Sequence, residues 1–142
     1  MADRSKFSLL IAEDDPRVRY LIEAAATRAG GFTRIESASD GQAALELLRN
    51  SKHADYPDLV VSDLCMPRMD GLNLIRELKR DPETRGIPIA IITSSNVPND
   101  RRDALAAGAY AFVEKPQGLE ALVRVLNALR DSCPTGTAAA KR

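Results

Sequence analysis

Short apolar runs alternate along the chain with longer stretches whose apolar residues recur at helical spacing. Each run of strand character is followed by one such helical stretch. The strands are predicted over residues 7–12, 33–37, 58–62, 87–92 and 110–113, and the helices over 16–29, 39–50, 71–80, 98–107 and 118–130. This order predicts an α/β domain in which right-handed crossovers join a parallel sheet covered by helices on both faces.

The ends of the helical stretches carry recognisable stop and start signals. The apolar residues of the first stretch share one helical face, and they are Val18, Leu21, Ile22, Ala25 and Ala29. Pro16 suits the first turn of this helix, and Gly30 and Gly31 can end it in a left-handed conformation. Residues 39–42 (Ser-Asp-Gly-Gln) predict a capping box for the second helix, and Asp70 predicts a cap for the third.

Composition narrows the class of protein. The 142 residues include 20 Lys and Arg and 20 Asp and Glu, so the formal net charge is zero and offers no bulk attraction to nucleic acid or to an anionic membrane. Hydrophobic residues make up 44%, which is enough for a buried core. No apolar run could span a bilayer, no signal peptide is recognised, and the two cysteines cannot form a disulfide framework. We therefore expect a cytoplasmic protein.

Polar residues gather where the predicted strands end. They are Glu13, Asp14 and Asp15 after the first strand, Asp63 after the third, Thr93 and Ser94 after the fourth, and Glu114 and Lys115 after the fifth. These ends share one edge of a parallel sheet, where ligands normally bind. Crowded carboxylates need neutralisation, and an all-oxygen cluster suits Mg²⁺. A phosphoryl group could bridge such a metal and a lysine, so the pattern predicts phosphoryl chemistry with a carboxylate as nucleophile.

Four segments at these strand ends form a specific combination. They are Leu-Ile-Ala-Glu-Asp-Asp-Pro at 10–16, Val-Val-Ser-Asp-Leu-Cys-Met-Pro-Arg-Met-Asp-Gly at 60–71, Ile-Ile-Thr-Ser at 91–94 and Gly-Ala-Tyr-Ala-Phe-Val-Glu-Lys-Pro at 108–116. In this combination the chain resembles the receiver domain of two-component response regulators over about residues 7–130. The resemblance implies a flavodoxin-like doubly wound fold, with a five-stranded parallel sheet of order 2-1-3-4-5 and five helices.

The resemblance assigns roles at the acidic end of the site. Asp63 matches the phosphoacceptor, Asp14 a direct metal ligand, and Glu13 an acid that acts on the metal through water. The backbone carbonyl of Cys65 matches a third protein ligand of the Mg²⁺ ion. The side chains of Cys65 and Ser95 lie two residues after a site residue, where receivers flank the path of the attacking water. We therefore expect these two positions to control dephosphorylation.

The resemblance also assigns the residues that respond to the phosphoryl group. Thr93 matches the hydroxyl that bonds a phosphoryl oxygen, and Lys115 matches the cation beside it. Phe112 matches the aromatic residue that swings inward on activation, although it lacks the hydroxyl of the tyrosine often found there. Pro116 follows the lysine and is a candidate for a cis peptide bond.

We expect a single receiver domain at residues 1–130 and a flexible tail at 131–142, without a separate output domain. The expected protein is not an enzyme but a switch that receives phosphate from a sensor histidine kinase or phosphotransfer protein. Residues 51–57 and 80–84 resemble single-domain receivers paired with phytochrome-type kinases. Two alternatives stay open, namely a phosphatase or mutase with an aspartyl-phosphate intermediate and a flavodoxin-like cofactor binder.

The output surface is predicted on the fourth helix, the fifth strand and the fifth helix. The helix at 98–107 has Leu105 as its only large apolar residue, so its packing is expected to be weak. In the last helix, Val125 and Leu129 widen the apolar arc beyond what one sheet face needs. This surplus predicts a surface for a downstream protein or a homodimer. The alternative is that the wide arc packs against the chain's own tail.

Overall fold

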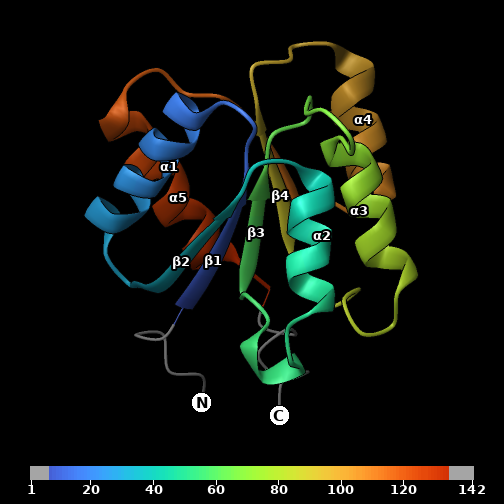
Figure 1. Ribbon diagram of the computed structural model, residues 1–142. Helices are drawn as coiled ribbons and strands as arrows, with labels where there is room; N and C mark the ends of the chain where they lie inside the picture. Colours follow the sequence, from blue (N-terminus) through green and yellow to red (C-terminus); the bar gives the residue numbers. More distant parts are fainter. Residues whose placement is uncertain (1–6, 135–142) are drawn as a thin grey trace.

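The computed structural model describes residues 7–134 as one parallel sheet with helices on both faces (Figure 1). The elements are β1 (Phe7–Ala12), α1 (Pro16–Ala29), β2 (Phe32–Ala38), α2 (Gly41–Arg49), a 3₁₀ turn (His53–Asp55), β3 (Leu59–Ser62), α3 (Gly71–Arg80), β4 (Ile89–Thr93), α4 (Pro98–Ala107), β5 (Ala111–Glu114) and α5 (Leu119–Ser132). The strand order is β2-β1-β3-β4-β5, and every pairing is parallel. The predicted doubly wound fold and strand order are confirmed.

Alternate residues of the central strands feed two separate hydrophobic layers. In β1, Leu9 and Ile11 face α1 and α5, whereas Leu10 and Ala12 face α2, α3 and α4. Figure 1 shows these two sets of helices on opposite faces of the sheet. Burial of each large apolar side chain contributes roughly 1.5–3 kcal/mol, so the continuous apolar runs of the sequence are explained by strands buried on both faces.

Aspartates cap the first three helices, α1, α2 and α3, at the carboxyl edge of the sheet. The carboxylate of Asp15 accepts a hydrogen bond from the Arg17 N–H at 2.9 Å, and Asp70 accepts one from the Asn73 N–H at 2.8 Å. The predicted cap on α3 is therefore confirmed. The capping box predicted to start at Ser39 is wrong, because α2 is capped by Asp40, whose carboxylate accepts from the Ala43 N–H. Asp caps as well as Ser, and the box was placed one residue early.

The last helix departs from expectation in its length and its packing. α5 continues to Ser132, two residues into the segment predicted as a tail. Cys133 packs against the hydrophobic cluster that α5 forms with α1 and the sheet. Leu129 is only 5% exposed within this cluster, so its prediction as surplus surface is wrong. The physical reason is that α5 lies beside α1 on the same face of the sheet, and contact with both the sheet and α1 requires a wide apolar arc. Residues 135–142 of the predicted tail lie outside the described part.

Membrane insertion of a helix finds no support in the described residues. Across residues 7–134, no helix combines the length and the apolar character needed to cross a bilayer.

Candidate functional site

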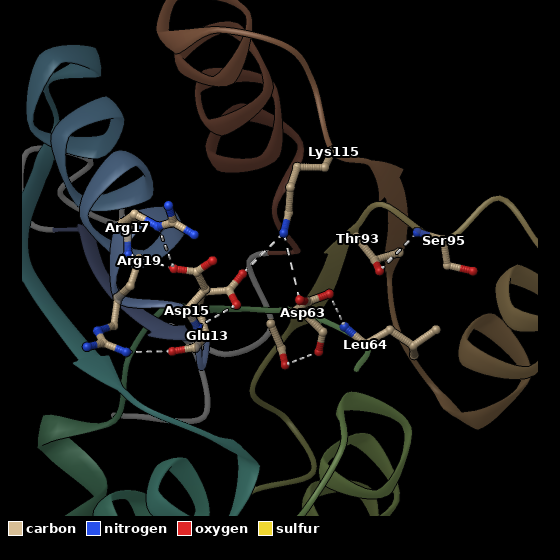
Figure 2. A network of polar contacts seen from close by, with 10 residues as sticks. Glu13, Asp15, Arg17, Arg19, Asp63, Leu64, Thr93, Ser95 and Lys115 are labelled. Atoms are coloured by element: carbon tan, nitrogen blue, oxygen red, sulfur yellow. Dashed lines mark hydrogen bonds and ion pairs between the residues drawn. The ribbon is translucent and has the colours of Figure 1, made fainter. Parts of the chain in front are cut away.

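Asp63 stands at the centre of the polar cluster, immediately after β3 (Figure 2). Its backbone N–H donates to the Ala12 carbonyl at 3.0 Å and so ties the residue to the end of β1. Its Oδ1 accepts a hydrogen bond from the Leu64 N–H at 2.7 Å. The side chain is 13% exposed. Asp63 is therefore held by backbone contacts on two sides while one carboxylate oxygen, Oδ2, faces the open part of the site.

Glu13 is the buried acid of the cluster, with 1% of its surface exposed. Its Oε2 accepts from the Asp15 N–H at 3.2 Å. Burial raises the pKa of Glu13, and the neighbouring charge of Asp63 adds to the rise, while the Asp15 N–H and the Lys115 ammonium act against it. Glu13 thus pays a desolvation cost that a nearby cation would relieve.

Lys115 joins the two carboxylates from the end of β5. Its Nζ lies 3.3 Å from Glu13 Oε1 and 3.7 Å from Asp63 Oδ2, as Figure 2 shows. The Lys115 backbone N–H also donates to the Thr93 carbonyl at 2.6 Å. Thr93 is buried at the end of β4, and its Oγ1 accepts from the Ser95 N–H at 3.3 Å. The backbones of Lys115 and Thr93 are therefore held next to each other at the ends of neighbouring strands.

The acidic residues can hold a metal ion. One carboxylate oxygen from each of Glu13, Asp14 and Asp63 lies within 4.8 Å of the other two. Asp14 is exposed, so an ion can reach the group from solvent. The donors are all hard oxygens, which Mg²⁺ prefers, and the predicted Mg²⁺ site fits these residues. A divalent cation would also relieve the repulsion among the three carboxylates.

An open cleft adjoins this group between the loop after β3 and the start of α4. Its lining includes Asp14, Cys65, Met66, Asp70, Asp100 and Asp103. Cys65 is exposed in this loop, and partial burial together with the carboxylates around it raises the pKa of its thiol. Ser95 donates from Oγ to Asp100 Oδ2 at 2.5 Å, and Figure 2 shows its side chain directed away from Asp63. Both residues have short side chains, so neither places a long polar group in this cleft.

Two further predictions concern Phe112 in β5 and Pro116, which follows Lys115. Phe112 is buried in the layer of α2, α3 and α4, so its ring is already inward, with the Arg101 guanidinium 5.8 Å from the ring centroid. Arg101 also donates to the Phe112 carbonyl at 3.0 Å and so links α4 to β5. The prediction of a cis bond before Pro116 is wrong, because every peptide bond between residues 7 and 134 is trans. The local Lys-Pro sequence allows either isomer, and the backbone path from β5 to α5 takes the trans one.

Sequence reasoning missed two arginines near the site. Arg19 lies on α1 and donates from Nη1 to the Glu13 carbonyl at 2.8 Å, which anchors the acidic turn. Arg68 lies in the loop after β3 and pairs with Asp40 at the start of α2. The contact of Arg19 spans six residues and could have been suspected from helical geometry. The contact of Arg68 spans 28 residues, and no local signal predicts it.

Comparison with known proteins places this chain in a recognised class of signalling domain. A family model described as "Response regulator receiver domain" matches residues 9–127. The chain belongs to this family.

Individual relatives agree with this assignment. A protein of Vibrio cholerae described as a probable cyclic di-GMP phosphodiesterase is 34% identical over 124 residues, covering 86% of this chain and 26% of the relative. The phosphorylated cyanobacterial phytochrome response regulator RcpA has a TM-score of 0.80 at 23% identity, covering 90% of this chain and 94% of that one. The Mn²⁺-bound form of response regulator Rcp1 has a TM-score of 0.75 at 21% identity, covering 89% and 93%.

The family assignment carries general consequences. Receiver domains of response regulators are signalling modules, generally without enzymatic activity, that interact with histidine kinases or phosphotransfer proteins and bind Mg²⁺ or Mn²⁺ at an acidic pocket. The chain spans only 26% and 15% of the length of the first two curated relatives it matches. What those longer proteins do is therefore a property of more than this domain.

Proposed function

We propose that this protein accepts a phosphoryl group on Asp63 in the presence of Mg²⁺ and thereby switches its binding to other proteins. The observation that carries the proposal is the position of the Lys115 Nζ, 3.7 Å from Asp63 Oδ2 at the edge of a three-carboxylate group. In phosphoryl transfer the negative charge is spread over the equatorial oxygens of the group, so catalysis rests on positioning and on cations placed around those oxygens. Lys115 and a divalent ion are suited to that task.

The remaining residues have distinct roles in this proposal. Asp14 and Asp63 bind the metal directly together with the Cys65 backbone carbonyl, and Glu13 acts through water. Mg²⁺ supplies charge neutralisation for the phosphoryl oxygens. Thr93, the last residue of β4, bonds a phosphoryl oxygen once the group is attached. Because the ring of Phe112 is already buried, we propose that the residue transmits the movement of Thr93 and Lys115 to α4 through its contact with Arg101 and not by an inward swing.

Phosphorylation can be tested with the purified chain, Mg²⁺ and a small phosphodonor such as acetyl phosphate or phosphoramidate. We expect the intact-protein mass to rise by one phosphoryl group, with an acid-stable and base-labile linkage. The Asp63→Asn variant should remain unmodified. Asp70→Asn is the matched control, because it makes the same change in the same loop and asparagine also caps a helix. Phosphate on the Asp63→Asn variant, or none on the parent chain, would overturn the assignment.

The same mass spectra followed over time measure the lifetime of the phosphorylated state. Cys65 and the Asp100-bonded Ser95 offer no long polar side chain that could hold an attacking water. We therefore expect slower loss of phosphate from the parent chain than from Cys65→Asn/Ser95→Glu. Equal decay rates would show that these positions do not control water access. An enzyme with an aspartyl-phosphate intermediate would instead turn over its substrate without accumulating the modified form.

The proposed partners are a sensor histidine kinase or phosphotransfer protein as donor and a downstream protein, or a second copy of the chain, as receiver of the signal. The likeness to the phytochrome response regulator RcpA supports a light-sensing kinase as the donor. The output face is proposed on α4, β5 and α5. Leu105 on α4 is 40% exposed and Val97 at its start is 50% exposed, so these two residues replace Leu129 as the apolar part of that face.

A further inference from the structure

Arg68 adopts a backbone conformation that arginine rarely takes. Its φ is +65°, and within residues 7–134 it is the only residue other than glycine with a positive φ. The left-handed region brings the Cβ of an L-residue close to the following carbonyl, so the conformation costs free energy unless the surroundings enforce it. A glycine would fit here without that cost. The side chain of Arg68 must therefore contribute something that a glycine could not.

The side chain of Arg68 makes a forked contact with a buried carboxylate. Its Nε and Nη2 donate to Asp40 Oδ2 at 2.8 Å and 2.5 Å. The side chain of Asp40 is 5% exposed, and its Oδ1 accepts from the Ala43 N–H in the first turn of α2. Burial alone would raise the pKa of Asp40, but these hydrogen bonds together hold it below its ordinary value. One carboxylate thus binds the start of α2 and the loop after β3 at the same time.

A second contact fixes the same loop to the same helix. The Gly41 N–H donates to the Met69 carbonyl at 3.1 Å. A Cβ on Gly41 would lie only 2.5 Å from that carbonyl oxygen, so the helix and the loop approach as closely as their backbones allow. Further along the loop, the Gly71 N–H donates to the Leu64 carbonyl at 2.8 Å. The segment between these anchors contains Cys65.

We propose that Arg68 is a positioning residue for the divalent cation, because its pairing with Asp40 fixes the loop whose Cys65 carbonyl binds the metal. This inference rests on the proposed Mg²⁺ site. Arg68 itself does not contact the ion, and its charge opposes a cation. Its contribution is the geometry of the loop three residues away. Groups that orient metal ligands in this indirect way often change metal affinity strongly when they are removed.

The charge of Arg68 gives the test a clear sign. Removing a positive charge near a cation site should strengthen Mg²⁺ binding if electrostatics alone were involved. Loss of loop geometry should weaken it. For Arg68→Gly we expect the Mg²⁺ dissociation constant, measured by isothermal titration calorimetry on the full chain without phosphodonor, to rise about 3–10-fold. Arg68→Lys keeps the charge but loses the fork, and should fall between parent and glycine variant.

Two further variants isolate the pair. Arg49→Ala removes an exposed arginine, paired with Glu77, from the far end of α2 and should leave Mg²⁺ affinity within about 1.5-fold of the parent because it touches no loop near the site. Asp40→Asn keeps an acceptor for the Ala43 N–H but weakens the pair with Arg68, so it should weaken Mg²⁺ binding as well. The double variant Arg68→Gly/Asp40→Asn should be no weaker than the more affected single variant, because both remove one interaction.

The outcomes separate this inference from the proposed function. If the parent chain binds Mg²⁺ and Arg68→Gly binds it equally or more tightly, the positioning role is wrong and the metal site stands. If the parent chain shows no Mg²⁺ binding, the metal site itself is wrong. Circular dichroism before each titration verifies that the variants are folded. If Arg68→Gly is not folded, the Mg²⁺ affinity of Arg68→Lys is compared with that of the parent chain instead.

Discussion

Neutralising the phosphoacceptor should change the stability of the protein in opposite directions with and without metal. At 4.8 Å and an effective dielectric constant of about 20, two like charges repel by about 3 kcal/mol, and Glu13 and Asp14 each lie within that distance of Asp63, so each opposes its ionised form by at least that amount before screening. The Lys115 Nζ lies 3.7 Å from Asp63 Oδ2, and its attraction offsets this repulsion by about 4 kcal/mol. Because Asp14 and part of Lys115 face solvent, screening reduces every one of these values. We expect Asp63→Asn to be about 1–2 kcal/mol more stable than the parent in the absence of metal.

Magnesium should reverse that order. A ligand that binds only the folded state at about 100 times its dissociation constant adds about 2.7 kcal/mol to the free energy of unfolding. Asp63→Asn lacks one carboxylate of the site and should gain little. The amide oxygen of the variant still accepts the Leu64 N–H, so the loop itself keeps its hydrogen bond.

Urea unfolding followed by circular dichroism measures both effects, once with chelator and once with saturating Mg²⁺. Glu46→Gln is the matched control, because it makes the same carboxylate-to-amide change at an exposed position of α2 and leaves the acidic site intact, so it should match the parent chain both in chelator and in Mg²⁺. The reasoning is refuted if Asp63→Asn is less stable than the parent in chelator, or if Mg²⁺ stabilises both chains equally.

Two further predictions follow from α5 and its end. Leu129→Ala should lower the free energy of unfolding by about 2–4 kcal/mol, whereas Val125→Ala, at a half-buried position, should lower it by about 1 kcal/mol. Equal losses of stability in urea unfolding would contradict the burial of Leu129. Burial raises the pKa of the Cys133 thiol from 9.0 to about 12, so the folded chain holds that proton where the unfolded chain releases it. The stabilising contribution of the protonated thiol is therefore complete below about pH 9 and is lost as the pH rises toward about 12. The difference in the free energy of unfolding between the parent and Cys133→Ala should narrow over that range, and unfolding across a pH series measures it.

The order of elements and the location of the site could be predicted from the sequence. Continuous apolar runs such as 9–12 and 59–61 are typical of strands buried on both faces, and the intervening helical periods then favour a parallel sheet. Acidic residues and a lysine placed directly after strands must meet at one edge of such a sheet. The proximity of Glu13, Asp63 and Lys115 follows from that rule, and the structure confirms it.

Only the tertiary structure decided which residues of similar pattern are buried and which long-range partners meet. Leu129 resembled a surplus apolar residue because the packing of α5 against α1 has no local signature in the sequence. The two helices are far apart along the chain, and the Arg130 side chain, for example, donates to the Gly30 carbonyl across a separation of 100 residues. The pairing of Arg68 with Asp40 depends in the same way on the close approach of a loop and a helix that are separate in sequence. Local periodicity reports which face of an element is apolar, whereas the identity of the partner depends on how the complete set of elements packs.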